Sequence, residues 1–173
     1  MRDWQSVFSD SEREAQRRWS DPTVWNEARI TRLLWQEIPA RYHARIEKVP
    51  FFFLATSDGN GRCDCSFKGG GPGLVRIIDS RTLEFPDFDG NNAFMSVGNI
   101  LANPHVGLLF IDFTDGARLR VNGRATIHDD AAPPVRFPQA KRIVKIRVEQ
   151  VVPNCAAHVP RLIPAASDPE MPA

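Results

Sequence analysis

The stretch Phe51-Phe52-Phe53-Leu54-Ala55-Thr56-Ser57, which runs directly into Asp58-Gly59-Asn60-Gly61, decides the fold class of this chain. Aromatic and β-branched residues favour a β-strand, whereas Asp, Asn and Gly favour a tight turn. The residues from Arg62 to Lys68 then return as a second strand, so the sequence predicts an antiparallel hairpin.

Short strands separated by turns continue through the rest of the chain. They are predicted over residues 74–78, 82–85, 106–113, 118–127 and 142–152. One short helix is expected between strands, over residues 93–101. Because strands and helices do not alternate, the pattern favours a mainly β (α+β) fold. We expect a small antiparallel β-barrel with helical additions rather than a doubly wound sheet.

The N-terminal part of the chain has a helical pattern. Ser20-Asp21-Pro22 is typical of a helix start, because it offers a capping oxygen and a proline in the first turn. The helix is predicted to end near Pro39 and to carry one apolar stripe of Val24, Ala28, Thr31, Trp35 and Ile38. The polar residues before Ser20 predict a short helical turn. The sequence thus divides into a helical segment (1–44), a barrel domain (45–162) and a flexible tail (163–173).

Composition excludes several classes of protein. The 173 residues suit one domain, and 22 Lys plus Arg against 21 Asp plus Glu leave a net charge of +1. That balance gives no support for nucleic-acid binding. The chain has no apolar run that resembles a signal peptide or a membrane span. Three cysteines are too few for a disulfide framework, so we expect a soluble protein of the reducing cytoplasm.

Two local motifs raise the question of chemistry. Cys63-Asp64-Cys65 is a single C-x-C pair without a second pair, so we expect no metal site and cysteines that are buried on a barrel strand. The run Gly69 to Gly73 matches neither a Walker loop nor a dinucleotide fingerprint. It indicates a sharply bent backbone or a close approach of another molecule beside Lys68, and a simple wide hairpin fits equally well.

Two other segments suit an anionic ligand. Residues 85–92 hold asparagines and a glycine ahead of the expected helix, whose free amides can receive a phosphate group. On the strand 118–127, Leu119, Val121, Gly123, Ala125 and Ile127 face one way, and Arg118, Arg120, Asn122, Arg124 and Thr126 face the other. The arginine row fits a solvated surface, a wet subunit interface or an anion site.

The order of several motifs resembles the pyridoxamine 5′-phosphate oxidase-related, FMN-binding split-barrel family. The resemblance covers roughly residues 45–162. Its motifs are Phe51 to Thr56, Asp64 to Gly70, Thr82 to Asp87, Gly98 to Phe110, Leu119 to Ala125, Val151 to Cys155 and Pro160-Arg161.

This resemblance implies an antiparallel split barrel that forms a homodimer with non-covalent FMN in the cleft between the two chains. The implied contacts divide into four groups. The residues expected along the flavin are Ser66, Phe67 and Lys68. Those expected close to the ring are Phe85, Pro86 and Asp87. Those expected to hold the ribityl phosphate are Asn91, Asn92, Ser96 and Asn99. Arg120 and Asn122 are expected to reach the cofactor from the second chain.

The resemblance also limits the implied function. Authentic pyridoxamine 5′-phosphate oxidases carry an Arg-Lys pair at the start of the short helix, where this chain has Phe94-Met95-Ser96. They also end in a segment with Trp and Arg, whereas this chain has no tryptophan after Trp35. We therefore expect an FMN-dependent oxidoreductase that is not the vitamin oxidase. Its substrate is a small molecule or a nicotinamide donor, and no catalytic residue is identified. The alternative is a non-catalytic carrier of flavin, haem or deazaflavin.

Overall fold

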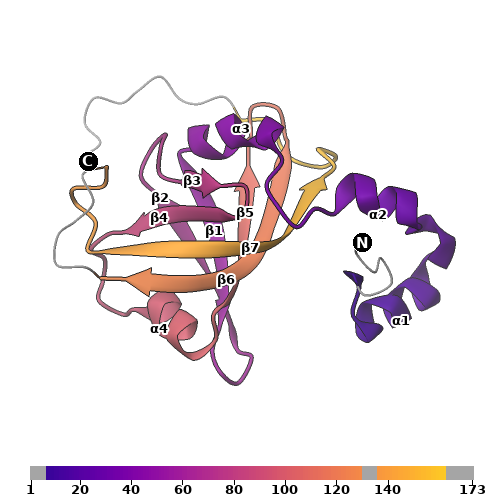
Figure 1. Cartoon of the computed structure of the whole chain (residues 1–173), viewed down its shortest axis with the longest axis horizontal. Helices are drawn as coiled ribbons and strands as arrows, with labels where there is room; N and C mark the ends of the chain where they lie inside the picture. Colours follow the sequence, from indigo (N-terminus) through magenta and orange to yellow (C-terminus); the bar gives the residue numbers. More distant parts are fainter. Residues whose placement is uncertain (1–6, 130–135, 163–173) are drawn as a thin grey trace.

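A single seven-stranded antiparallel sheet, curved into a barrel, forms the body of the computed structural model (Figure 1). The structure describes residues 7–129 and 136–162. The expected flexible tail, residues 163–173, lies outside the described residues. The strands are β1 (Phe51–Ser57), β2 (Cys63–Gly69), β3 (Arg76–Asp79), β4 (Thr82–Asp87), β5 (His105–Ile111), β6 (Arg118–His128) and β7 (Arg142–Asn154).

The hairpin predicted from the aromatic stretch is present, with Phe51 opposite Gly69 and Ser57 opposite Cys63. The other predicted strands also form, with ends that shift by a few residues. Strand β3, for example, begins at Arg76, and Leu74 and Val75 before it are buried in the core.

The strand order is β2-β1-β5-β6-β7-β4-β3, so β2 and β3 form the two ends of the sheet. The fold is therefore an α+β split barrel rather than a closed one, as the sequence led us to expect. The loop that follows β2 runs close to the end of β4. A Cβ added at Gly70 in this loop would lie 3.2 Å from the ring of Phe88, just after β4.

The main core is a cluster of aliphatic and aromatic side chains inside the barrel, and two smaller clusters form around Ile30 and around Phe137. Phe52 lies at its centre, with its ring 5.0 Å from that of Phe85 and 5.5 Å from that of Phe110. On β1, β5 and β6 these inward residues alternate with outward ones, as on β6, where Leu119, Val121 and Ala125 are buried. The alternation predicted for β6 is confirmed.

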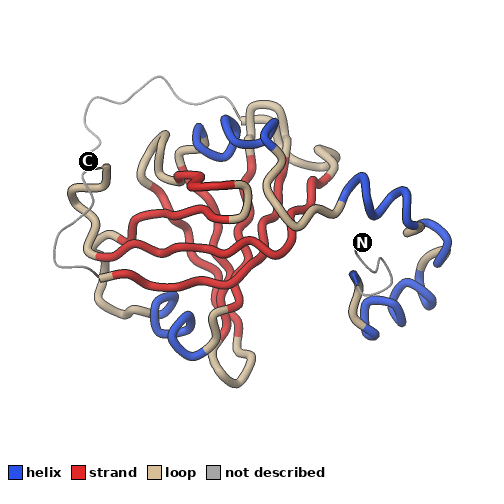
Figure 2. Tube along the Cα trace, viewed as in Figure 1, coloured by secondary structure: helices blue, strands red, loops and turns tan. Residues whose placement is uncertain are grey.

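Within residues 7–129 and 136–162, four helices accompany the barrel: α1 (Asp10–Trp19), α2 (Glu27–Leu33), α3 (His43–Lys48) and α4 (Met95–Ala102). Short 3-10 turns occur at Pro22–Val24 and Ala40–Tyr42. Figure 2 shows α1 and α2 to one side of the barrel, whereas α3 and α4 lie against it. None of the helices in the described ranges is long and apolar enough to cross a membrane.

The single helix predicted from Ser20 to Pro39 is wrong. Helix α2 ends at Leu33, and Trp35 pairs with Val151 through two backbone hydrogen bonds. On α2 and at its end the buried side chains are Ile30 and Leu34, whereas Ala28 and Thr31 of the predicted stripe are exposed. Ile38 is buried in the barrel core and Trp35 packs against that core, as the stripe predicts, but both lie beyond the end of the helix. A strand-like bridge thus replaces the last part of the helix, because β7 offers unpaired backbone groups there. The short turn expected before Ser20 is instead the ten-residue helix α1, which Ser9 and Glu12 cap reciprocally.

The close approach of β6 and β7 at Gly123 can be tested by mutation. The β6–β7 register shifts at Asn122 and Gly123, where an added Cβ would lie 2.2 Å from the carbonyl oxygen of Arg147. We expect Gly123→Ala to lower the free energy of unfolding by about 1–3 kcal/mol, because the backbone of β7 has to move.

The matched control is Gly98→Ala on α4, where an added Cβ meets nothing within 4 Å. This change should raise stability by about 0.5–1 kcal/mol, because alanine restricts the unfolded chain. Urea unfolding followed by circular dichroism measures both variants. Equal stability of the two variants would contradict the close approach.

Candidate functional site

Strand β2 presents two chemically different faces at the end of the sheet. Asp64, Ser66 and Lys68 are half-buried and point to the barrel side, where their partners on β1 are Thr56, Leu54 and Phe52. Cys63, Cys65 and Phe67 are exposed on the outer side. The edge of β2 away from β1 has no partner strand among the described residues, so its backbone groups are available to a ligand.

Helix α4 packs over the barrel side of β2 and β1 through polar contacts. The hydroxyl oxygens of Ser66 and Ser96 are 2.9 Å apart, and the hydroxyl of Ser96 lies 3.5 Å from Asp64 Oδ2. Asn99 Nδ2 donates to Thr56 Oγ1 at 3.0 Å. The structure therefore brings together Ser66, Ser96 and Asn99, three residues predicted from different segments, although Asn99 anchors α4 to β1.

The segment that enters α4 has an unusual backbone. Asn92 and Phe94 adopt left-handed conformations, with φ of 60° and 49°, and Asn91 Oδ1 accepts a hydrogen bond from the amide of Ala93. Phe94 occupies the N-cap position without a side-chain cap. The first amides of α4 thus lack the capping oxygen that a Ser, Thr, Asp or Asn would supply, and successive amides near a left-handed residue suit an anion.

Arg142, at the start of β7, contacts residues on both sides of the segment that enters α4. Its Nε and one terminal nitrogen both donate to Asp87 Oδ2 at 2.8 Å, and its guanidinium lies 4.9 Å from the ring centroid of Phe94. Arg142 therefore links the end of β4 to the start of α4. The sequence reasoning missed this residue, because only the fold brings Asp87 and Phe94 to it.

The three residues predicted near the ring, Phe85, Pro86 and Asp87, differ in how far their side chains are available to a ligand. Phe85 is 1% exposed and packs in the core, so only its backbone is available to a ligand. Pro86 lines a hollow of about 210 Å³ together with Gly70 and Phe88. The carboxylate of Asp87 is held by Arg142.

The remaining predicted residues lie on the outer face of the sheet. Phe67 is 61% exposed there and stacks on Phe51, with ring centroids 5.1 Å apart. On β6, Arg120 Nε donates to Asn154 Oδ1 and Asn122 Nδ2 donates to Gln150 Oε1, both at 3.0 Å. Within one chain, Arg120 and Asn122 are therefore separated from Ser66 and Ser96 by the sheet itself.

The prediction of buried cysteines on β2 is wrong. Cys63 and Cys65 are exposed, as is Cys155. The physical reason is the register of the hairpin: β2 points its even-numbered residues inward, which places both cysteines on the outer face. Among the described residues, no group of three or more His, Cys, Asp or Glu side chains could hold a metal ion.

The donor set at α4 fits a phosphate-bearing ligand. Two hydroxyls, uncapped amides and the ammonium group of Lys68 on the same face of β2 are groups that bind phosphate. Asp64 opposes an anion, but it lies on the far side of Ser66 from Lys68 along the strand. Along β2, Ser66 lies between Lys68 and Asp64, and the hydroxyl of Ser96 contacts Ser66.

Solved structures share this fold. HupZ of Group A Streptococcus, in a single-residue variant, is 19% identical with a TM-score of 0.55, over 68% of this chain and 99% of that one. A Lactobacillus delbrueckii protein, provisionally described as a pyridoxamine 5′-phosphate oxidase, is 22% identical with a TM-score of 0.52, over 68% and 94%. No curated protein sequence matches the chain.

The family described as pyridoxamine 5′-phosphate oxidase matches residues 38–159, which is most of the chain. The matched range contains the whole sheet, helix α4 and every residue of the site described above. The chain belongs to the pyridoxamine 5′-phosphate oxidase family.

Proposed function

We propose that this protein is a homodimeric, FMN-dependent oxidoreductase that is not itself a pyridoxamine 5′-phosphate oxidase. The observation that carries the proposal is the contact of Ser66 with Ser96, which joins the edge of β2 to the uncapped start of α4. Family membership makes FMN the first cofactor to test, since the donors at this corner suit its phosphate. Bound FMN supplies hydride and electron transfer.

In this proposal, the phosphate of FMN and its ring bind on different sides of β2. Lys68, Ser66, Ser96 and the amides after Phe94 hold the phosphate on the barrel side. The free edge of β2 offers backbone groups to the ring, and Phe67 covers the ring on the outer side. Arg142 positions the start of α4 through Asp87 and Phe94.

A second copy of the chain is part of the proposed site. The outer face of β1, β2 and β5 carries Phe51, Phe53, Phe67, Leu109 and Ile111, an apolar surface that a monomer leaves in water. The arginine row of β6 borders this surface, because Leu109 lies opposite Arg120 and Ile111 opposite Arg118. Dimerisation through this face would bring Arg120 and Asn122 to the partner's flavin.

The start of α4 supports the proposal that the chain is not the vitamin oxidase. The start of α4 carries Phe94 and Met95, which are 46% and 61% exposed and apolar, where the oxidases have a cationic pair. Lys68 is therefore the main cation that one chain offers to the phosphate. The carrier alternative shares this binding site and differs only in turnover, so kinetics must separate the two.

The first prediction concerns the cofactor. Purified protein should take up FMN, and Lys68→Ala should weaken FMN binding by about 1.5–3 kcal/mol, because a charge-assisted contact to the phosphate is lost. Flavin fluorescence quenching during titration measures the dissociation constant.

Lys145→Ala on β7 is the matched control, because Lys145 is half-buried on a strand like Lys68 and three strands separate β7 from β2 in the sheet. It should leave FMN affinity unchanged. Protein that stays colourless after incubation with FMN contradicts the cofactor, whereas equal affinity of the two variants removes Lys68 from the site.

The second prediction concerns the dimer. Sedimentation velocity at micromolar concentration should give a dimer for the unmodified chain. Phe53→Glu should shift it to a monomer, because a charge is placed in the centre of the apolar face. Ile78→Glu is the control, since Ile78 is 43% exposed but lies on β3 at the other end of the sheet. A monomeric unmodified protein would refute this part of the proposal.

The third prediction separates enzyme from carrier. FMN-loaded protein is mixed without oxygen with NADH, NADPH or small organic reductants, and the flavin absorbance is followed by stopped flow. An oxidoreductase should bleach with at least one donor on a timescale of seconds, and the rate should saturate with donor concentration. Tight FMN retention without bleaching by any donor would favour the carrier.

A further inference from the structure

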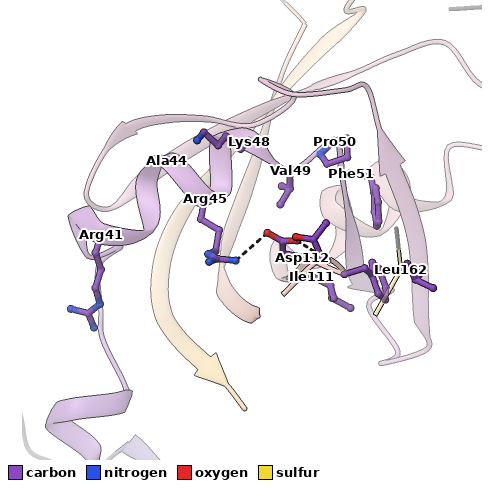
Figure 3. A pocket seen from close by; sticks show the side chains of 12 residues that line it. Arg41, Ala44, Arg45, Lys48, Val49, Pro50, Phe51, Ile111, Asp112 and Leu162 are labelled. Carbon is purple, nitrogen blue, oxygen red and sulfur yellow. Dashed lines mark hydrogen bonds and ion pairs between the residues drawn. The ribbon is translucent and has the colours of Figure 1, made fainter. Parts of the chain in front are cut away.

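Strand β2 carries a carboxylate next to the hydroxyls proposed to hold the phosphate of FMN. Asp64 is half-buried on the barrel side of the strand. Two other half-buried aspartates form ion pairs, since Asp87 pairs with Arg142 and Asp112 pairs with Arg45 (Figure 3). Asp64 forms no ion pair among the residues that the structure describes. Its negative charge is therefore met by hydrogen bonding alone.

Asp64 accepts a hydrogen bond from helix α4. The hydroxyl of Ser96 donates to Asp64 Oδ2 at 3.5 Å, and the same hydroxyl oxygen lies 2.9 Å from that of Ser66. Ser96 is 7% exposed, so water competes little for its hydroxyl. Ser96 thus connects the carboxylate to the second hydroxyl of the proposed phosphate site.

The hydroxyl protons of this group have one direction. An ionised carboxylate accepts hydrogen bonds and donates none, so the single hydroxyl proton of Ser96 goes to Asp64. The contact between the two serines then uses the proton of Ser66. Both protons are directed toward Asp64, and both oxygens have only lone pairs left for another ligand. A phosphate needs donors, so this arrangement has the wrong polarity for it.

We propose that Asp64 sets how strongly the chain holds the phosphate of FMN, and that it acts through the hydroxyl of Ser96. When a phosphate binds, Ser96 has to release Asp64 and turn its proton to the ligand, which lowers the net affinity. Asp64 is a positioning residue, because it acts on the ligand through another side chain. This role rests on the proposed FMN site and adds a residue that opposes binding there.

Direct repulsion is a second way in which Asp64 could oppose a phosphate. Lys68 lies four positions further along β2, about 13 Å away at the usual rise per residue of a strand. Salt screens most of the interaction between half-exposed charges at that separation. A phosphate on Lys68 is therefore affected by Asp64 mainly through the serine hydroxyls, and mutation can separate the two effects.

The test is a double-mutant cycle on Asp64 and Ser96, with FMN affinity measured by quenching of flavin fluorescence. Asp64→Asn should tighten FMN binding about tenfold, because an amide oxygen holds the Ser96 proton less strongly than a carboxylate. Asp64→Ala removes the acceptor and should tighten binding at least as much. In Ser96→Ala protein, the same two changes should alter FMN affinity by less than about twofold, because the connecting hydroxyl is absent.

Two controls accompany the cycle. Riboflavin has the same ring and ribityl chain as FMN but no phosphate, and its affinity should be equal in unmodified and Asp64→Asn protein. Glu27→Gln on α2 removes one negative charge from an exposed side chain of a helix that lies to one side of the barrel (Figure 2). This variant should leave FMN affinity unchanged.

A further measurement needs no flavin. In FMN-free protein, inorganic phosphate should raise the midpoint of thermal unfolding more for Asp64→Asn than for the unmodified chain, relative to chloride at equal ionic strength. If this difference appears but no variant takes up FMN, the flavin assignment fails and the role of Asp64 stands. If FMN binds and neither measurement responds to Asp64, the role of Asp64 fails alone.

Three results would overturn the role of Asp64. The first is unchanged FMN affinity in both Asp64 variants. The second is an equal gain in FMN and riboflavin affinity, which would mean that the phosphate is not involved. The third is an equal gain in FMN affinity with and without the Ser96 hydroxyl, which would assign the effect to direct repulsion.

Discussion

The antiparallel pairing of β6 with β7 is the interaction on which the rest of the structure depends. In the sheet, strands β5, β1 and β2 lie on the β6 side of this pair, and strands β4 and β3 lie on its β7 side. The register shift at Gly123 lets the two strands approach closely, and their inward side chains close the core. The two walls of the candidate site, the edge of β2 and the end of β4, are thus positioned from opposite ends of this pair.

Much of the barrel could be predicted because local chemistry and tertiary packing agree. The aromatic run at Phe51 and the turn at Asp58 specify a hairpin without help from distant residues. The alternation on β6 is equally local, since every second side chain must be apolar to enter the core. The family motifs imply that Ser66 and Ser96 lie near each other, and their hydroxyl oxygens are 2.9 Å apart.

The features that could not be predicted depend on strand pairing or packing that the local sequence pattern does not fix. Helical spacing continued past Leu33, but the backbone of Trp35 pairs with Val151 more than a hundred positions later. The face of β2 that carries Cys63 follows from the hairpin register, which composition alone does not fix. Arg142 had no local pattern to mark it, and its role arises only where Asp87 and Phe94 meet.

The open edge of β2 has a consequence for the solubility of the chain. A free strand edge is a template on which another extended chain can add, and such addition is a common route to aggregation. Asp64 and Lys68 point inward from this strand, so an incoming strand would have to pack next to two charges that lack a partner on it. Helix α4 shields the same side through Ser96. The charges that shape the candidate site thus also discourage uncontrolled polymerisation at the sheet edge.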